Sequence, residues 1–247
     1  MTNNLELYKE YIKIMCPNFP QSKKGKDLDK YYTIEIISRG KDNPNASAAN
    51  EHFKNYYIYC WEDFDKHMPR IIECCTKLRM RAYASVNWKS NRQVAMNTVA
   101  AMAKRIADGD FKRIYAEYES QSGHYSYRNE NVWLIDVDDV DMNSLLDEDK
   151  IASIENAIND CRSQFKNNII MKIPTRSGCH ILCRPFDLSS FTDTFIINKS
   201  FRKQFPELDN KIDETNMDLQ TMRNTVLSWL NTDFIHKNHI TLLYENL

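Results

Sequence analysis

The chain has few glycines, no long apolar run and almost no net charge. Only five glycines occur among 247 residues, so each is expected to mark a turn with a backbone requirement. A formal net charge of −1 excludes a generic polyanion-binding protein, and any contact with nucleic acid must come from local basic clusters. No window is long and apolar enough to span a membrane, and the N-terminal residues form no signal core. We therefore expect a soluble, cytoplasmic protein without a membrane partner.

The cysteines lack the pattern of a structural zinc site or of a disulfide framework. They are odd in number and include no Cys-x-x-Cys pair, which favours a reducing compartment. Cys179 and Cys183 beside His180 also allow a zinc half-site, although strand alternation explains a buried Cys183 without a metal. The seven positions are Cys16, Cys60, Cys74, Cys75, Cys161, Cys179 and Cys183.

What is present is an ordinary globular composition with alternating strand and helix patterns. A hydrophobic fraction of 42% with 13 Tyr and 11 Phe is that of a folded chain, and the length suits one large domain or a domain with an appendage. Period-two patterns predict strands at 32–37, 56–60, 81–86, 133–138, 169–173, 181–184 and 239–244. Helical spacing predicts helices at 5–15, 62–77, 90–107 and 147–161, while 108–131 is expected to be a loop or short hairpin and 189–230 partly helical.

The first candidate site is a pair of carboxylates at the end of an apolar strand, in Trp133-Leu134-Ile135-Asp136-Val137-Asp138. Residues i and i+2 of a strand point to the same face, so Asp136 and Asp138 are expected to direct their oxygens to one point. Such a pair suits a hard divalent cation, Mg²⁺ or Mn²⁺. A strand that is simply followed by an acidic loop would have the same sequence. The apolar residues before Asp136 favour the functional interpretation, because an unpaired charge there is costly to desolvate.

The second candidate is the turn Thr175-Arg176-Ser177-Gly178-Cys179-His180, which leads into an apolar strand. A hydroxyl and an imidazole beside a glycine can hydrogen-bond phosphate oxygens. A tight turn with a histidine satisfied by the backbone is the alternative. Positive charge for a polyanionic ligand comes from the flanking Lys172, Arg176 and Arg184.

The order of these two motifs resembles that of the archaeo-eukaryotic primase superfamily, especially the primase–polymerase domains of phages and plasmids. Those domains have a strand that ends in D-x-D or D-x-E, then a helix and a strand, then a T-x-S-G-x-x-H turn and a third acidic motif. The resemblance covers roughly residues 130–245, and the turn here is one residue tighter than the commonest version. For the third acid the best candidate is Asp233, with Asp213, Asp218 and Glu245 as alternatives.

This resemblance implies an α+β fold, with an N-terminal αβ unit (1–110) packed on a C-terminal RRM-like, mixed or antiparallel sheet (130–247), the two meeting at a catalytic cleft as one catalytic domain. It implies template-dependent transfer of nucleotides from NTP or dNTP to a 3′-hydroxyl in DNA replication. Asp136, Asp138 and Asp233 would hold two Mg²⁺ or Mn²⁺ ions. Ser177, His180, Arg176 and Lys172 would bind the triphosphate. The implied partners are a single-stranded template and a replicative helicase, in the cytoplasm of a bacterial host.

A basic and aromatic group in the N-terminal half is a candidate surface for the template strand. Basic side chains interleaved with aromatic rings are typical of single-strand binding, where the bases stack on the rings. The residues are Arg79, Arg81, Trp88, Lys89 and Arg92.

Two other functions use the same residues. One is a different metal-dependent phosphoryl-transfer enzyme such as a nuclease, with water as the nucleophile, which would need no nucleoside triphosphate. The other is a non-catalytic RRM-like nucleic-acid-binding module that lacks the third acid. Binding of Mn²⁺ by the wild type but not by Asp136→Ala distinguishes an enzyme from such a module.

Overall fold

The computed structural model describes residues 1–24, 28–42, 51–112, 114–124, 131–138, 145–161, 167–231, 235–237 and 240–246. The chain forms two compact units. Unit 1 comprises Met1–Asn131 and Ile240–Leu247, and unit 2 comprises Val132–His239. Each unit has its own sheet, and all the strand pairings in the described part are antiparallel. The fold class is therefore α+β, as the sequence predicts.

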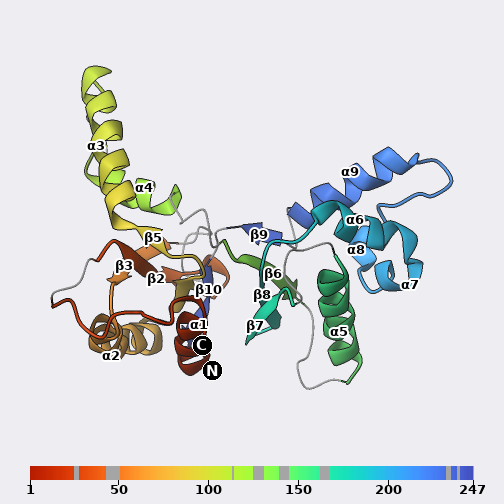
Figure 1. The fold of residues 1–247 in the computed structure, drawn as a ribbon, viewed down its shortest axis with the longest axis horizontal. Helices are drawn as coiled ribbons and strands as arrows, with labels where there is room; N and C mark the ends of the chain where they lie inside the picture. The colour runs from red at the N-terminus through yellow and green to blue at the C-terminus, as the bar shows by residue number, and fades with distance from the viewer. Residues whose placement is uncertain are drawn as a thin grey trace. The chain divides into compact units, whose positions relative to one another are not determined.

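The sheet of unit 1 is built from both ends of the unit's sequence (Figure 1). Its strand order is β1-β10-β4-β2-β3, and β5 pairs with the start of β2. The strands are β1 (Thr2–Asn3), β2 (Lys30–Ser38), β3 (Glu51–Ile58), β4 (Arg81–Ser85), β5 (Lys89–Ser90) and β10 (Ile240–Glu245).

Helices cover both faces of this sheet. One face packs on α1 and α2, where the ring of Tyr8 contacts the rings of Tyr32 and Phe64. The other face contacts α4, because Tyr118 packs on Tyr57 of β3. The helices are α1 (Leu5–Met15), α2 (Trp61–Leu78), α3 (Asn91–Ala107) and α4 (Glu117–His124), with short 3-10 turns η1 (Gly40–Asp42) and η2 (Ile114–Ala116).

The helices predicted in unit 1 follow from local sequence signals. The helix expected at 62–77 is α2, and its apolar residues at helical spacing, Phe64, Met68 and Ile71, are buried. Ser90 caps α3 by accepting a hydrogen bond from the backbone N–H of Gln93, which satisfies one of the free donors of the first turn. The segment expected to be a loop or hairpin instead contains α4, whose apolar periodicity is weak because its residues are mostly polar.

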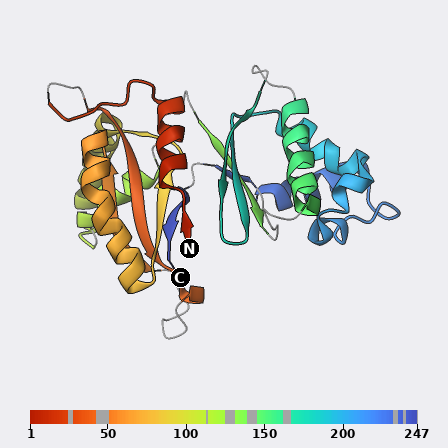
Figure 2. The ribbon, with the colours of Figure 1, turned by 90° about the horizontal axis from the view of Figure 1, so that it is seen from below.

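Unit 2 has a four-stranded sheet with helices packed on one side of it (Figure 2). The strand order is β7-β8-β6-β9. The strands are β6 (Trp133–Asp138), β7 (Ile169–Pro174), β8 (Gly178–Cys183) and β9 (Ile235–Lys237). The helices are α5 (Leu145–Asp160), α6 (Leu188–Ile197), α7 (Lys199–Arg202), α8 (Pro206–Asp209) and α9 (Leu219–Trp229).

The core of unit 2 lies between one face of this sheet and the helices. From the strands, alternate residues Ile135, Val137, Cys179 and Ile181 enter this core. From the helices and their connections come α5 side chains and a set of phenylalanines in edge-to-face contact with one another and with Trp229. Because Val137 points into the core, Asp136 and Asp138 on either side of it point to the opposite face.

The last strand differs from its expected place. The resemblance includes it in the C-terminal sheet unit (130–247), but β10 pairs with β4 and β1 of unit 1, whereas β9 pairs with β6. The alternation predicts that 239–244 is a strand but does not name its partner. Leu243 is buried within unit 1, and Glu245 pairs there with Arg81, which explains the location.

All seven cysteines are free thiols. Burial raises the pKa of Cys75 and of Cys161 to about 12 and that of Cys179 to about 11, so these thiols are protonated at neutral pH. Within the described ranges, no helix combines the length and the apolar character that a membrane crossing needs.

Candidate metal and phosphate site

The register between β6 and β8 brings the two sequence motifs together. Asp136 lies opposite His180, and Asp138 lies opposite Gly178. Nε2 of His180 is 3.4 Å from Oδ1 of Asp136. Oγ of Ser177 donates a hydrogen bond of 3.1 Å to Oδ1 of Asp138. Two motifs far apart in the sequence thus form one polar cluster at one end of the sheet of unit 2.

Gly178 makes this close approach of the two strands possible. A Cβ atom at this position would lie 1.9 Å from the carbonyl oxygen of Val137, a distance that no real contact allows. Only glycine therefore permits β8 to start here beside β6. The turn before it is closed by a hydrogen bond of 2.8 Å from the N–H of Thr175 to the carbonyl oxygen of Gly178.

The side chains of the cluster differ in their exposure. His180 is buried and Asp136 is half-buried, with its Oδ1 inaccessible to solvent. Asp138 and Ser177 are exposed at the open end of the cluster, and Arg176 is exposed in the turn next to them. A ligand that reaches the cluster from solvent would therefore meet Asp138, Ser177 and Arg176 first.

Lys172 is not brought to this cluster. It lies opposite Ile181, whose side chain is in the helix-covered core, so Lys172 is on the same helical side of the sheet. Its Nζ is 3.1 Å from Oε1 of Glu155 on α5. In the sequence, Lys172 is near enough to His180 to suggest that both bind the same phosphate, but the strand pairing places the two residues on opposite faces of the sheet.

The predicted template-binding group is not a common surface, since three of its five members are buried in unit 1. Arg81 makes ion pairs with Asp42 at 2.7 Å and with Glu245 at 3.2 Å. Trp88 packs on Tyr32, and Lys30 lies over its ring.

Lys89 donates a hydrogen bond to the carbonyl oxygen of Ser122, and burial lowers the pKa of its ammonium group. Arg79 and Arg92 are exposed, but they lie beyond opposite ends of β4. The structure therefore offers no contiguous template groove made from these residues.

The third acid predicted for metal binding, Asp233, falls outside the described residues. Of the alternatives, Asp213 accepts hydrogen bonds from Thr215 and Asn216, which lower its pKa to about 2. Asp218 caps α9, and Glu245 belongs to unit 1. In the part of the chain that the structure describes, no group of three or more His, Cys, Asp or Glu side chains is arranged to hold a metal ion.

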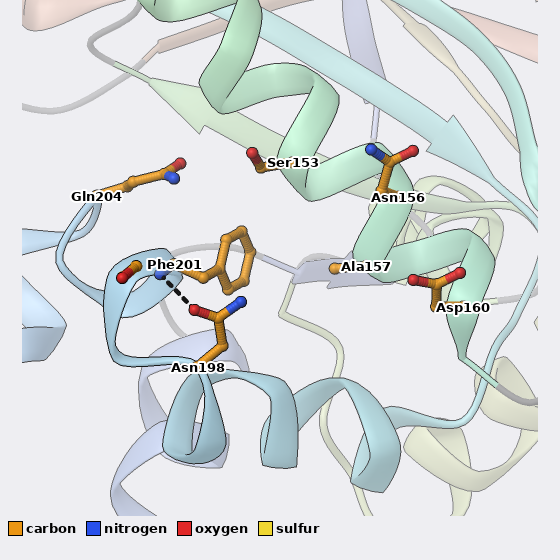
Figure 3. Close-up of a pocket in the computed structure, with 8 residues that line it drawn as sticks. Ser153, Asn156, Ala157, Asp160, Asn198, Phe201 and Gln204 are labelled. Carbon is orange, nitrogen blue, oxygen red and sulfur yellow. Dashed lines mark hydrogen bonds between the residues drawn. The ribbon is translucent and has the colours of Figure 1, made fainter.

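A separate hollow of about 310 Å³ lies between α5 and α7, on the far side of α5 from the sheet (Figure 3). Ala157 and Phe201 form its apolar part, and Asn198 accepts a hydrogen bond from the N–H of Phe201 at its rim. None of the residues singled out from the sequence lines it, and the pattern of α5 gave no signal for it. Its polar lining residues are Ser153, Asn156, Asp160, Asn198, Ser200 and Gln204.

No family model matches the chain, and no curated protein or solved structure matches it either.

Proposed function

We propose that this chain is a metal-dependent nucleotidyltransferase of the primase–polymerase type, which adds nucleotides from NTP or dNTP to a 3′-hydroxyl on a nucleic-acid template. One observation carries the proposal: the antiparallel register of β6 and β8 places Asp136 and Asp138 beside His180 and Ser177. Carboxylates next to hydrogen-bond donors are the groups that a metal–triphosphate complex requires.

The chemistry of the donors fits a hard divalent ion. Asp136 and Asp138 supply carboxylate oxygens from one face of one strand, and Oδ1 of Asp136 is held out of bulk solvent. Both residues would hold the ion, with Asp233 as the proposed third ligand. A bound Mg²⁺ or Mn²⁺ would neutralise phosphate charge and make a hydroxyl a better nucleophile.

The remaining residues of the cluster would bind the triphosphate. Ser177 and His180 offer an O–H and an imidazole N–H to the β- and γ-phosphates, and Arg176 adds charge from the exposed turn. Lys172 has no part in this proposal, because it pairs with Glu155 on the other side of the sheet.

Primer extension on a single-stranded template, with NTP or dNTP and either Mg²⁺ or Mn²⁺, tests the proposal. The wild type should extend a primer, and Asp136→Asn should abolish extension. His180→Ala should weaken nucleotide binding by about 1.5–3 kcal/mol, the contribution of a charge-assisted hydrogen bond. Lys172→Ala is the matched control and should retain activity, because its side chain lies on the helical face.

Three outcomes would contradict the proposal. Degradation of nucleic acid without a triphosphate would indicate a nuclease that uses water as the nucleophile. Binding of single strands without any extension would indicate a non-catalytic module. Extension that survives Asp136→Asn would mean that the active site lies elsewhere.

A further inference from the structure

Helix α3 carries a row of exposed apolar side chains that the function proposed above does not use. Met96, Val99 and Ile106 are 65%, 68% and 53% exposed, and Tyr115 after the helix is 83% exposed. Val99 and Ile106 are among the apolar residues of this helix, but its buried side chains are Val94 and Thr98. Figure 1 shows α3 rising away from the sheet of unit 1. Exposed apolar groups gathered on one helix face are typical of an interaction surface.

The row has the spacing of a helix-pairing seam. Met96, Val99, Ala103 and Ile106 follow one another at intervals of three and four residues, as the a and d positions of a coiled coil do. Ala103 is small and also exposed, so a second helix can approach α3 closely at that point. We call these four residues the α3 seam.

We propose that the α3 seam pairs with the same seam of a second copy of this chain, with the two helices antiparallel. When Val99 is set opposite Ala103 of the second copy, Met96 falls opposite Ile106 and a larger side chain meets a smaller one at the centre. Twofold symmetry repeats each contact, so one complementary pair is used twice.

Charge favours the antiparallel arrangement over the parallel one. The same register places the exposed Arg92 at the C-terminal end of α3 of the second copy, which carries the partial negative charge of the helix dipole, whereas parallel pairing would set Arg92 against Arg92. Opposite charges across an interface fix orientation, and like charges exclude the alternative.

The pairing should be reversible. A helix of this length is about 25 Å long, and a single helix pair buries less than the roughly 800 Å² per partner of a stable interface. We therefore expect a dimer that forms in the micromolar concentration range and dissociates on dilution.

Sedimentation over a range of protein concentrations tests the proposal. The wild type should pass from monomer to dimer, and Val99→Glu should weaken association at least tenfold with an unchanged melting temperature, because the side chain is exposed. Leu78→Glu, at a 48% exposed apolar position on α2, is the control and should dimerise like the wild type. A wild type that stays monomeric throughout, or equal association of both variants, would overturn the proposal.

Disulfide trapping tests the register, in a parent carrying Cys16→Ser to remove the one cysteine that is not buried. A mixture of Met96→Cys and Ile106→Cys chains should crosslink on oxidation, whereas neither variant should crosslink alone. In antiparallel pairing the two copies of residue 96 lie about 15 Å apart along the axis, beyond the roughly 7 Å limit for a disulfide. Crosslinking of either variant alone would contradict the antiparallel register.

Discussion

The carboxylate–histidine cluster of unit 2 and the basic residues of unit 1 come from similar sequence evidence but have different structural roles. In unit 2, Asp136 and His180 lie side by side on one face of a sheet. In unit 1, Arg81 and Lys89 are turned inward and are bound by the protein itself. The unit 2 residues remain candidates for ligand binding, whereas these two basic residues stabilise the fold.

The difference lies in how strongly each pattern constrains geometry. Alternation along a strand fixes which side chains share a face, whatever the tertiary structure is. A charged residue near an aromatic one carries no such constraint, and a nearby carboxylate in the fold can pair with it. Arg81 is an example, because it pairs with Asp42 and Glu245, which are far from it in the sequence.

Removing the charge of Arg81 should have the largest effect on stability. Arg81→Met leaves the carboxylates of Asp42 and Glu245 buried without their partner, and the loss of one member of a buried ion pair costs about 3–5 kcal/mol. Denaturant-induced unfolding measures it. Lys66→Met, which removes the same charge from an exposed site on α2, should change the free energy of unfolding by less than about 0.5 kcal/mol. A similar small change for Arg81→Met would show that its ion pairs do not stabilise unit 1.

Gly178→Ala should have the next largest effect, because the new methyl group would collide with the backbone of Val137. Forcing the strands apart should cost about 3 kcal/mol or more and break the hydrogen bond from Ser177 to Asp138. Gly109→Ala is the control: its φ of +70° is unfavourable for alanine, but no atom lies within 4 Å, so a cost of only about 1 kcal/mol is expected. Equal costs at the two sites would mean that β6 and β8 are not in close contact at Gly178.

The aromatic residues also distinguish the two units, and they predict a smaller effect of pH. Most of the aromatic side chains buried in unit 1 are tyrosines, whereas most of those buried in unit 2 are phenylalanines, and burial raises the pKa of Tyr57 to about 12. Because the pKa of Tyr57 is higher in the folded protein than in the unfolded chain, its contribution to the free energy of unfolding is full below pH 10. This contribution is lost as the pH rises toward 12. Tyr57→Phe should reduce that fall in a pH series of unfolding curves, and Tyr115→Phe, at an exposed site, should not. An unchanged pH profile for Tyr57→Phe would contradict this.

The local elements could be predicted from the sequence, but their long-range partners could not. The alternation around Asp136 gives both the strand and its face, and Ser90 marks the start of α3. Nothing local shows that β10 joins unit 1 while β9 pairs with β6, because strand pairing depends on which surfaces are left to be covered.

At the candidate site, too, the positions that depend on long-range pairing could not be predicted from the sequence. The pairing of Asp136 with His180 is consistent with the predicted convergence of the two motifs. Lys172 lies on the other face because its neighbour Ile173 is the residue that pairs with His180, and the sequence does not show which residues of the two strands pair. The hollow beside α5 was also missed, since its residues come from separate helices and share no periodicity.

Calorimetric titration with Mn²⁺ tests most directly whether Asp136 and Asp138 form one metal site. The wild type should bind the ion, and Asp136→Asn and Asp138→Asn should each abolish binding, since the acid that remains offers too few hard ligands. Asp149→Asn, which removes an exposed carboxylate from α5 in the same unit, should bind like the wild type. Equal binding of Mn²⁺ by the wild type and by Asp136→Asn would contradict the account.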